Sequence, residues 1–144
     1  MLTRLLFAAC LCAGLSAHAD STIKVSNDWV RATAPGQDVG AAYMTLKSPV
    51  DAKLVKVESD VAESVEIHSM SMKDGVMQMR MLDVLPLPAN KEVALAPGGF
   101  HLMLFDLKAP LKAGSKVRFK LHVQDSSGKE QVIQHLSPVQ AGKD

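Results

Sequence analysis

Histidine and methionine are the side chains best suited to chemistry in this sequence, and they gather in two short segments. Five of the eight methionines lie between residues 70 and 81, directly after His68. The second segment is His101-Leu102-Met103. Thioether sulfur and imidazole suit soft copper(I), whereas hard ions such as Ca²⁺ and Mg²⁺ prefer oxygen ligands. These residue types therefore indicate a site for a soft metal ion.

Strand geometry would group these side chains into rows. Residues two apart on a strand share one face, so His101 and Met103 are predicted to point the same way. The same rule predicts two further rows, one of His68, Met70 and Met72 and one of Met77, Met79 and Met81. Methionine is also a common packing residue. Alternation alone therefore leaves open which of these methionines would bind a metal ion.

The elements that must position these rows are predicted to be short β-strands. Apolar or alternating runs recur near residues 23–25, 29–31, 40–47, 53–58, 64–68, 77–81, 92–95, 101–106, 116–123 and 131–137. The clearest alternation, over residues 117–123, has apolar side chains at the odd positions. Turn sequences such as Lys73-Asp74-Gly75 separate the runs. The pattern predicts an all-β fold, an antiparallel β-sandwich or Greek-key barrel.

The N-terminus has the features of a cleavable secretory signal. Arg4 is followed by an apolar run over residues 5–15 and then by Ala17-His18-Ala19. We therefore predict a signal peptide over residues 1–19, cleavage after Ala19, a periplasmic location and a single domain over residues 20–144. An uncleaved anchor is an alternative, but this run is short against the ~20 residues of a membrane-spanning helix. No stable membrane insertion is expected after cleavage.

Both cysteines of the chain, Cys10 and Cys12, lie inside this apolar run. A lipoprotein signal is the second alternative, although Cys10 follows Phe7-Ala8-Ala9 rather than a leucine-headed sequence. Cleavage after Ala19 would leave a domain without any thiol. Such a domain has no disulfide, no cysteine-type zinc site and no cysteine nucleophile.

Charge and residue pattern argue against several classes of function. The chain has 16 basic and 15 acidic residues with no basic stripe, so no nucleic-acid partner is expected. No nucleophile–base pattern stands out, and we expect no enzymatic activity. An electron-transfer blue-copper protein needs a cysteine thiolate beside two histidines, which residues 20–144 lack. A purely structural adhesive module remains an alternative.

The other aromatic and imidazole side chains are predicted to have structural roles. Trp29 and Tyr43 are expected to be buried aromatics. His122 occupies a polar position of the alternating run, and both it and His135 are expected to face solvent.

The spacing of histidine and methionine resembles that of a known family, the periplasmic copper(I) chaperones written PCuAC. Their motif is a histidine, ten residues, a methionine, twenty-one residues and then His-x-Met. This chain has that spacing in His68, Met79, His101 and Met103. Neighbouring segments are similar as well, among them Trp29-Val-Arg31, Gly40-Ala-Ala-Tyr43, Gly75-Val-Met77-Gln-Met79-Arg80, Leu95-Ala-Pro97-Gly98-Gly99 and His101-Leu-Met103-Leu.

The resemblance implies a cupredoxin-like β-sandwich that binds one copper(I) ion per chain. It assigns the metal ligands to His68, Met79, His101 and Met103 and gives no such role to Met77 or Met81. It implies delivery of copper(I) to the dinuclear copper centre of cytochrome c oxidase, directly or through a thiol-bearing assembly factor, by a monomer. A periplasmic copper or silver scavenger for metal tolerance, with no dedicated acceptor, is the alternative.

Two departures from the family pattern affect these expectations. Ser69 follows the first histidine, where some members have methionine. Some members also have a His/Met-rich C-terminal extension that takes a second copper ion, whereas this chain ends in Val139-Gln-Ala-Gly-Lys-Asp144. We therefore expect one copper site.

Overall fold

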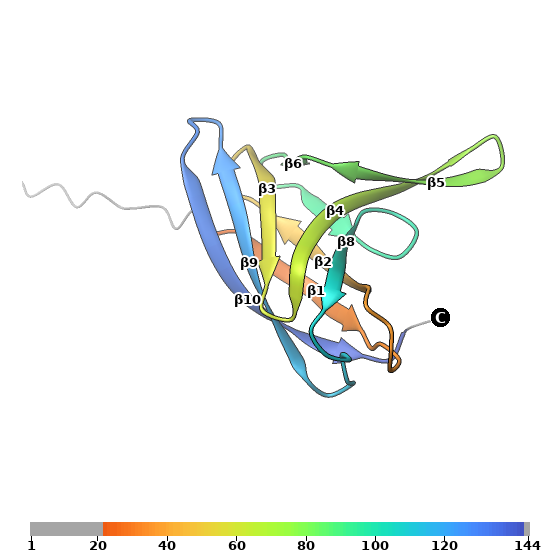
Figure 1. The fold of residues 1–144 in the computed structure, drawn as a ribbon. Coiled ribbons are helices and arrows are strands. Elements are labelled where there is room, and N and C mark those ends of the chain that lie inside the picture. Colours follow the sequence, from red (N-terminus) through yellow and green to blue (C-terminus); the bar gives the residue numbers. More distant parts are fainter. Residues whose placement is uncertain (1–21, 143–144) are drawn as a thin grey trace, which may run out of the picture.

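The computed structural model describes residues 22–142, and within that range the chain folds into ten β-strands and no helix (Figure 1). The strands are β1 (Lys24–Arg31), β2 (Gly40–Lys47), β3 (Ala52–Ser59), β4 (Ala62–Lys73), β5 (Val76–Leu82), β6 (Leu85–Leu87), β7 (Glu92–Leu95), β8 (His101–Leu107), β9 (Lys116–Asp125) and β10 (Glu130–Gln140). The predicted signal peptide, residues 1–19, lies outside the described residues.

Seven of the strands close into a barrel, as the alternating pattern predicts. Their order is β4-β8-β2-β1-β10-β9-β3, and β3 returns to β4 through the pair Val57↔Val65. The remaining strands are additions: β5 pairs with β4, β6 with β3 and β7 with β2. The all-β fold is confirmed. One barrel pair is parallel rather than antiparallel: the first strand, β1, lies beside the last strand, β10, and runs in the same direction.

The barrel interior is filled by alternate side chains of each strand. On β9 the odd positions of residues 117–123 are buried, with Phe119 and Leu121 completely inaccessible to solvent. On β8 the even positions Leu102 and Leu104 are equally buried. Met44 on β2 is also fully buried, so this methionine has a packing role. The odd positions of β8, including His101, consequently lie on the outer face of the barrel.

Trp29 and Tyr43 are buried, as predicted, and pair across β1 and β2. Their ring centroids are 4.6 Å apart with a tilt of 33°. The guanidinium of Arg31 lies 5.5 Å from the centre of the Trp29 ring. A cation over an aromatic face is favourable, so this cluster links the C-terminal end of β1 to the middle of β2.

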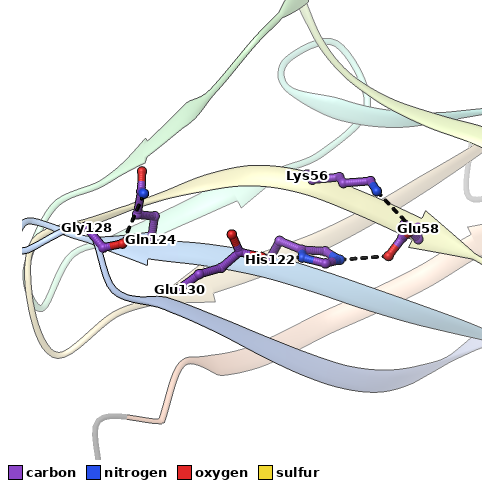
Figure 2. A network of polar contacts seen from close by, with 6 residues as sticks. All are labelled: Lys56, Glu58, His122, Gln124, Gly128 and Glu130. Atoms are coloured by element: carbon purple, nitrogen blue, oxygen red, sulfur yellow. Dashed lines mark hydrogen bonds and ion pairs between the residues drawn. The ribbon is translucent and has the colours of Figure 1, made fainter.

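His122 lies between two carboxylates on the outer face of β9 (Figure 2). Its Nδ1 is 2.6 Å from Glu130 Oε1 on β10, and its Nε2 is 2.7 Å from Glu58 Oε2 on β3. Lys56 Nζ contacts the other oxygen of Glu58 at 3.1 Å. His122 lies on the outer face of β9, as predicted, but its imidazole side chain is only 16% exposed. Carboxylates from the neighbouring strands cover it, which the sequence did not predict. His135 is likewise partly covered, with Nε2 2.9 Å from Asp28 Oδ2.

These contacts make the stability of the barrel depend on pH. Hydrogen bonds to Glu130 and Glu58 raise the pKa of His122, and the bond from His122 lowers the pKa of Glu58. The His122 contribution is present below the ordinary histidine pKa and is lost as pH rises through the raised folded-state pKa. The Glu58 contribution is lost as pH falls through its lowered pKa. Both contributions are therefore present together in mildly acidic solution.

We predict that His122→Gln destabilises the protein more at about pH 5.5 than at about pH 9, because the contribution of His122 is lost as pH rises through its raised folded-state pKa. Urea unfolding of the variant and the wild type at the two pH values measures this difference. Lys120→Gln, which removes a positive charge from the same face of β9, is the control and should show little change in its effect between the two pH values. An equal loss of stability from His122→Gln at both pH values would contradict the charged bridge.

Candidate metal centre

His68 and His101 face each other across the pairing of β4 with β8. They are directly opposed in the strand register, and their ring centroids are 5.7 Å apart. Their strand neighbours Ile67 and Leu102, also opposed, point into the core. The two imidazoles consequently lie together on the outer face, although only 9% and 4% of these residues is exposed. Met103 is partly buried two residues along β8, on the face that the sequence predicts.

A loop between β7 and β8 holds His101 in place. Both strands pair with β2. The loop between them leaves the barrel wall after Leu95 and returns at Phe100, and these two residues form a β-bridge that closes the loop. Gly98 has φ of 85°, a conformation that favours glycine. The carbonyl oxygen of Gly99 accepts hydrogen bonds from Met70 N at 3.2 Å and from His101 Nδ1 at 3.1 Å. The loop is thereby attached to β4 and to the histidine.

Hydrogen bonds at the two histidines determine which ring nitrogens are free. His101 Nδ1 donates to a carbonyl oxygen, so its Nε2 keeps a lone pair. His68 Nε2 is 2.7 Å from Glu66 Oε2 and donates to that carboxylate, which leaves the lone pair on Nδ1. His68 Nδ1 is buried without any hydrogen-bond partner. A buried polar atom left unsatisfied costs about 1–3 kcal/mol, and a metal ion bound at this nitrogen would satisfy it.

Glu66 and the carbonyl of Gly99 are the site groups that the sequence analysis missed. A carboxylate or carbonyl that accepts the second N–H of a metal-binding histidine fixes the ring and its tautomer. Glu66 stands two residues before His68 on β4, and it is directly opposite Met103. The Glu-x-His spacing on a strand is a signal that could have identified it. Phe105, whose ring centroid is 6.1 Å from that of His68, adds apolar cover.

The five methionines between residues 70 and 81 lie on the hairpin formed by β4 and β5. This hairpin projects beyond the barrel (Figure 1). Its two-residue turn has positive φ at Asp74 and Gly75, 51° and 75°, as an Asp-Gly hairpin turn requires. The rungs after it are Met72↔Met77, Met70↔Met79 and His68↔Met81. Opposed residues of an antiparallel pair share a face. The two predicted methionine rows therefore lie on the same face as His68 and His101.

The register distinguishes among the methionines of β5. Met81 is directly opposite His68, and Met79 is one rung further out, opposite Met70. A diagonal neighbour on an antiparallel pair is ~7–8 Å away, which is within reach of a long side chain. Met77 is a rung beyond Met79. Among the predicted ligands, the structure opposes His68 and His101 directly. By register, Met103 on β8 and Met79 on β5 are each a diagonal neighbour of His68 on the same face.

Residues 22–142 contain no group of three or more His, Cys, Asp or Glu side chains arranged to hold a metal ion. Over the same residues, no helix has the length and apolar character needed to cross a membrane.

Solved structures with a similar fold include one copper-bound domain and one copper(I) form. The copper-bound PCuAC domain from PmoF2 has a TM-score of 0.64 and 25% identity, covering 83% of this chain and 93% of that domain. The copper(I) form of DR1885 from Deinococcus radiodurans has a TM-score of 0.59 and 31% identity, covering 89% and 83%. Its apo form has a TM-score of 0.62 and 28% identity, covering 99% and 95%. The cupredoxin-like fold is confirmed.

Curated relatives and a family model match most of the sequence. Lxx21020 of Leifsonia xyli subsp. xyli is 34% identical over 106 residues, which make up 73% of this chain and 64% of that protein. RP573 of Rickettsia prowazekii is 29% identical over 117 residues, 77% of this chain and 65% of that protein. The match thus spans slightly less than two thirds of both relatives. The model of the LpqE-like family, whose description is that of a lipoprotein, matches residues 23–134. The chain therefore belongs to the LpqE-like family.

Proposed function

We propose that this protein binds one copper(I) ion through His68, Met79, His101 and Met103 and delivers it to another protein. The observation that carries the proposal is the opposed pair His68 and His101, in which each ring keeps one nitrogen lone pair free. Met103 lies on the same face and supplies a thioether. The likeness to copper-bound PCuAC domains supports the choice of metal.

The chemistry of these donors favours copper(I) over other ions. Two imidazoles and two thioethers are neutral, soft or borderline ligands, and they lack the oxygen donors that Ca²⁺, Mg²⁺ and Mn²⁺ need. The nearest carboxylate, Glu66, is engaged with His68 Nε2 at 2.7 Å. Methionine binds without losing a proton, and the absence of thiolate keeps the affinity below that of a cysteine site.

Delivery rather than storage is supported by the uneven burial of the ligands. Both histidines are buried, whereas Met79 is 49% exposed on the projecting hairpin. An acceptor could therefore replace the thioether of Met79 first and take the ion by stepwise ligand exchange. The proposed acceptor is the dinuclear copper centre of cytochrome c oxidase or a thiol-bearing assembly factor.

We further propose that the protein acts in the periplasm after cleavage behind Ala19. The lipoprotein description of its family supports export. Mass analysis of the exported protein distinguishes a chain that begins at Asp20 from one that carries lipid on a cysteine.

Anaerobic copper(I) titration tests the ligand set. We predict one tightly bound ion, with weaker binding after His68→Ala, His101→Ala, Met103→Ala or Met79→Ala, because each change removes a soft donor. Met81→Ala is the matched control, since Met81 shares the strand, the face and a similar exposure, 52% against 49% for Met79. A greater loss from Met81→Ala than from Met79→Ala would assign the fourth ligand to the rung directly opposite His68.

Glu66→Gln tests the hydrogen bond to His68. A carboxylate holds the imidazole more firmly than an amide does, and loss of such an outer contact costs ~10–100-fold in metal affinity. Copper(I) affinity should fall by that order while the free energy of unfolding without metal changes little. Glu63→Gln, an exposed change on the same strand, is the control. Unchanged affinity in Glu66→Gln would remove Glu66 from the site.

Copper(I) transfer separates delivery from scavenging. The copper(I)-loaded protein is mixed with the isolated copper domain of cytochrome c oxidase or with its thiol-bearing assembly factor. Transfer of the ion to this acceptor should be faster than transfer to the same acceptor from a small copper(I) chelator. Three results together would favour the scavenger. The loaded protein would retain its ion, cells that lack the gene would assemble the oxidase normally, and these cells would grow poorly in excess copper.

A further inference from the structure

A ladder of methionines continues outward from the proposed copper site along the β4–β5 hairpin. We define the methionine ladder as its two outer rungs, Met70↔Met79 and Met72↔Met77. These four side chains lie on one face, which is also the face of His68. Only Met79 takes part in the proposed copper site, so the ladder contains three thioethers without an assigned role.

Burial argues against a packing role for the ladder. Met72, Met77 and Met79 are 64%, 50% and 49% exposed, and Met70 is partly buried. The opposite face of the same hairpin is mostly polar, with Ser71 opposed to Gln78 and Ser69 opposed to Arg80. The hairpin is therefore two-sided, and its sulfur-bearing side is open to solvent.

Strand stability does not account for the choice of methionine either. β5 is a terminal strand of the sheet. Exposed edge strands usually have charged residues that prevent aggregation, and strands in general favour β-branched and aromatic residues. Methionine provides neither advantage at these positions. It provides a polarisable sulfur on a flexible side chain.

Rung geometry would let several sulfurs reach one ion. Opposed side chains on antiparallel strands have Cβ atoms ~4.5–5.5 Å apart, and diagonal neighbours are ~7–8 Å apart. Met72 and Met77 are opposed, and Met70 is diagonal to Met77. Three flexible thioethers can thus converge on a soft monovalent ion, while Lys73 and Arg80 belong to the other face.

We propose that Met70, Met72 and Met77 form a second, weaker site for copper(I), through which the ion reaches and leaves the histidine pair. This inference rests on the proposed function and extends it. The site is weaker because its ligands are neutral, exposed and lack imidazole. Met79 stands between the two sites and belongs to the same rung as Met70. An ion can therefore move along the hairpin by exchanging one thioether for the next.

Silver(I) titration followed by NMR of ¹³C-methyl-labelled methionine tests the proposal. Silver(I) is a soft monovalent ion without unpaired electrons, so each methyl signal remains visible. The first equivalent should shift Met103 and Met79, and further silver should shift Met70, Met72 and Met77 in a saturable manner. The double variant Met72→Leu/Met77→Leu keeps the apolar volume and should lose the second phase while retaining the first.

Two comparisons make the outcome decisive. Ser71→Ala/Gln78→Ala alters the opposed pair on the other face and should keep both phases. His68→Ala/His101→Ala should lose the first phase and keep the second, which belongs to the methionine ladder. If this variant binds silver(I) as the wild type does, the proposed histidine site is wrong, whereas the ladder site is still supported. Absence of saturable shifts at Met72 and Met77 in the wild type overturns the ladder site. So does an unchanged second phase in Met72→Leu/Met77→Leu, which would leave the ladder as an apolar docking face.

Discussion

The pairing of β4 with β8 is the constraint on which the candidate site depends, because it sets two histidines from distant parts of the chain opposite each other. This register is fixed from inside the barrel, where Ile67 and Leu102 are opposed and buried. A slip of one residue would turn a histidine into the core and an aliphatic side chain outward. Burial of apolar surface thus positions the two histidines, and the hydrogen bonds to Glu66 and to the carbonyl of Gly99 orient their rings.

The length of β4 explains why the site lies at the root of a projecting hairpin. β4 has twelve residues, and its first half closes the barrel by pairing with β3 and β8. Beyond His68, β4 continues past His101, the first residue of β8, and its strand partner there is β5. His68 stands where the barrel wall becomes the hairpin. One side of the site is therefore supported by the core, and the other side is exposed and accessible to a partner.

Sequence periodicity predicted which face a side chain occupies but not which strand lies beside it. It placed His101 with Met103, arranged both methionine rows correctly and identified the buried positions of β9. It did not predict the parallel pairing of β1 with β10, the carboxylates around His122 or the contact of Glu66 with His68. These depend on long-range strand pairing, which tertiary packing decides. The same limit applies to Met79 and Met81, since alternation treats them as equivalent and the register separates them.

The tight turn at Asp74 and Gly75 restricts how the hairpin can change in evolution. Only two residues connect the strands, so this turn determines which residue each methionine of the hairpin is paired with. Loss of one residue from one strand shifts that strand against its partner and sets methionine opposite serine. Loss of one residue from each strand beside the turn preserves all remaining rungs. Insertions and deletions in this hairpin are therefore expected in matched pairs, and homologues should differ in its length by even numbers of residues.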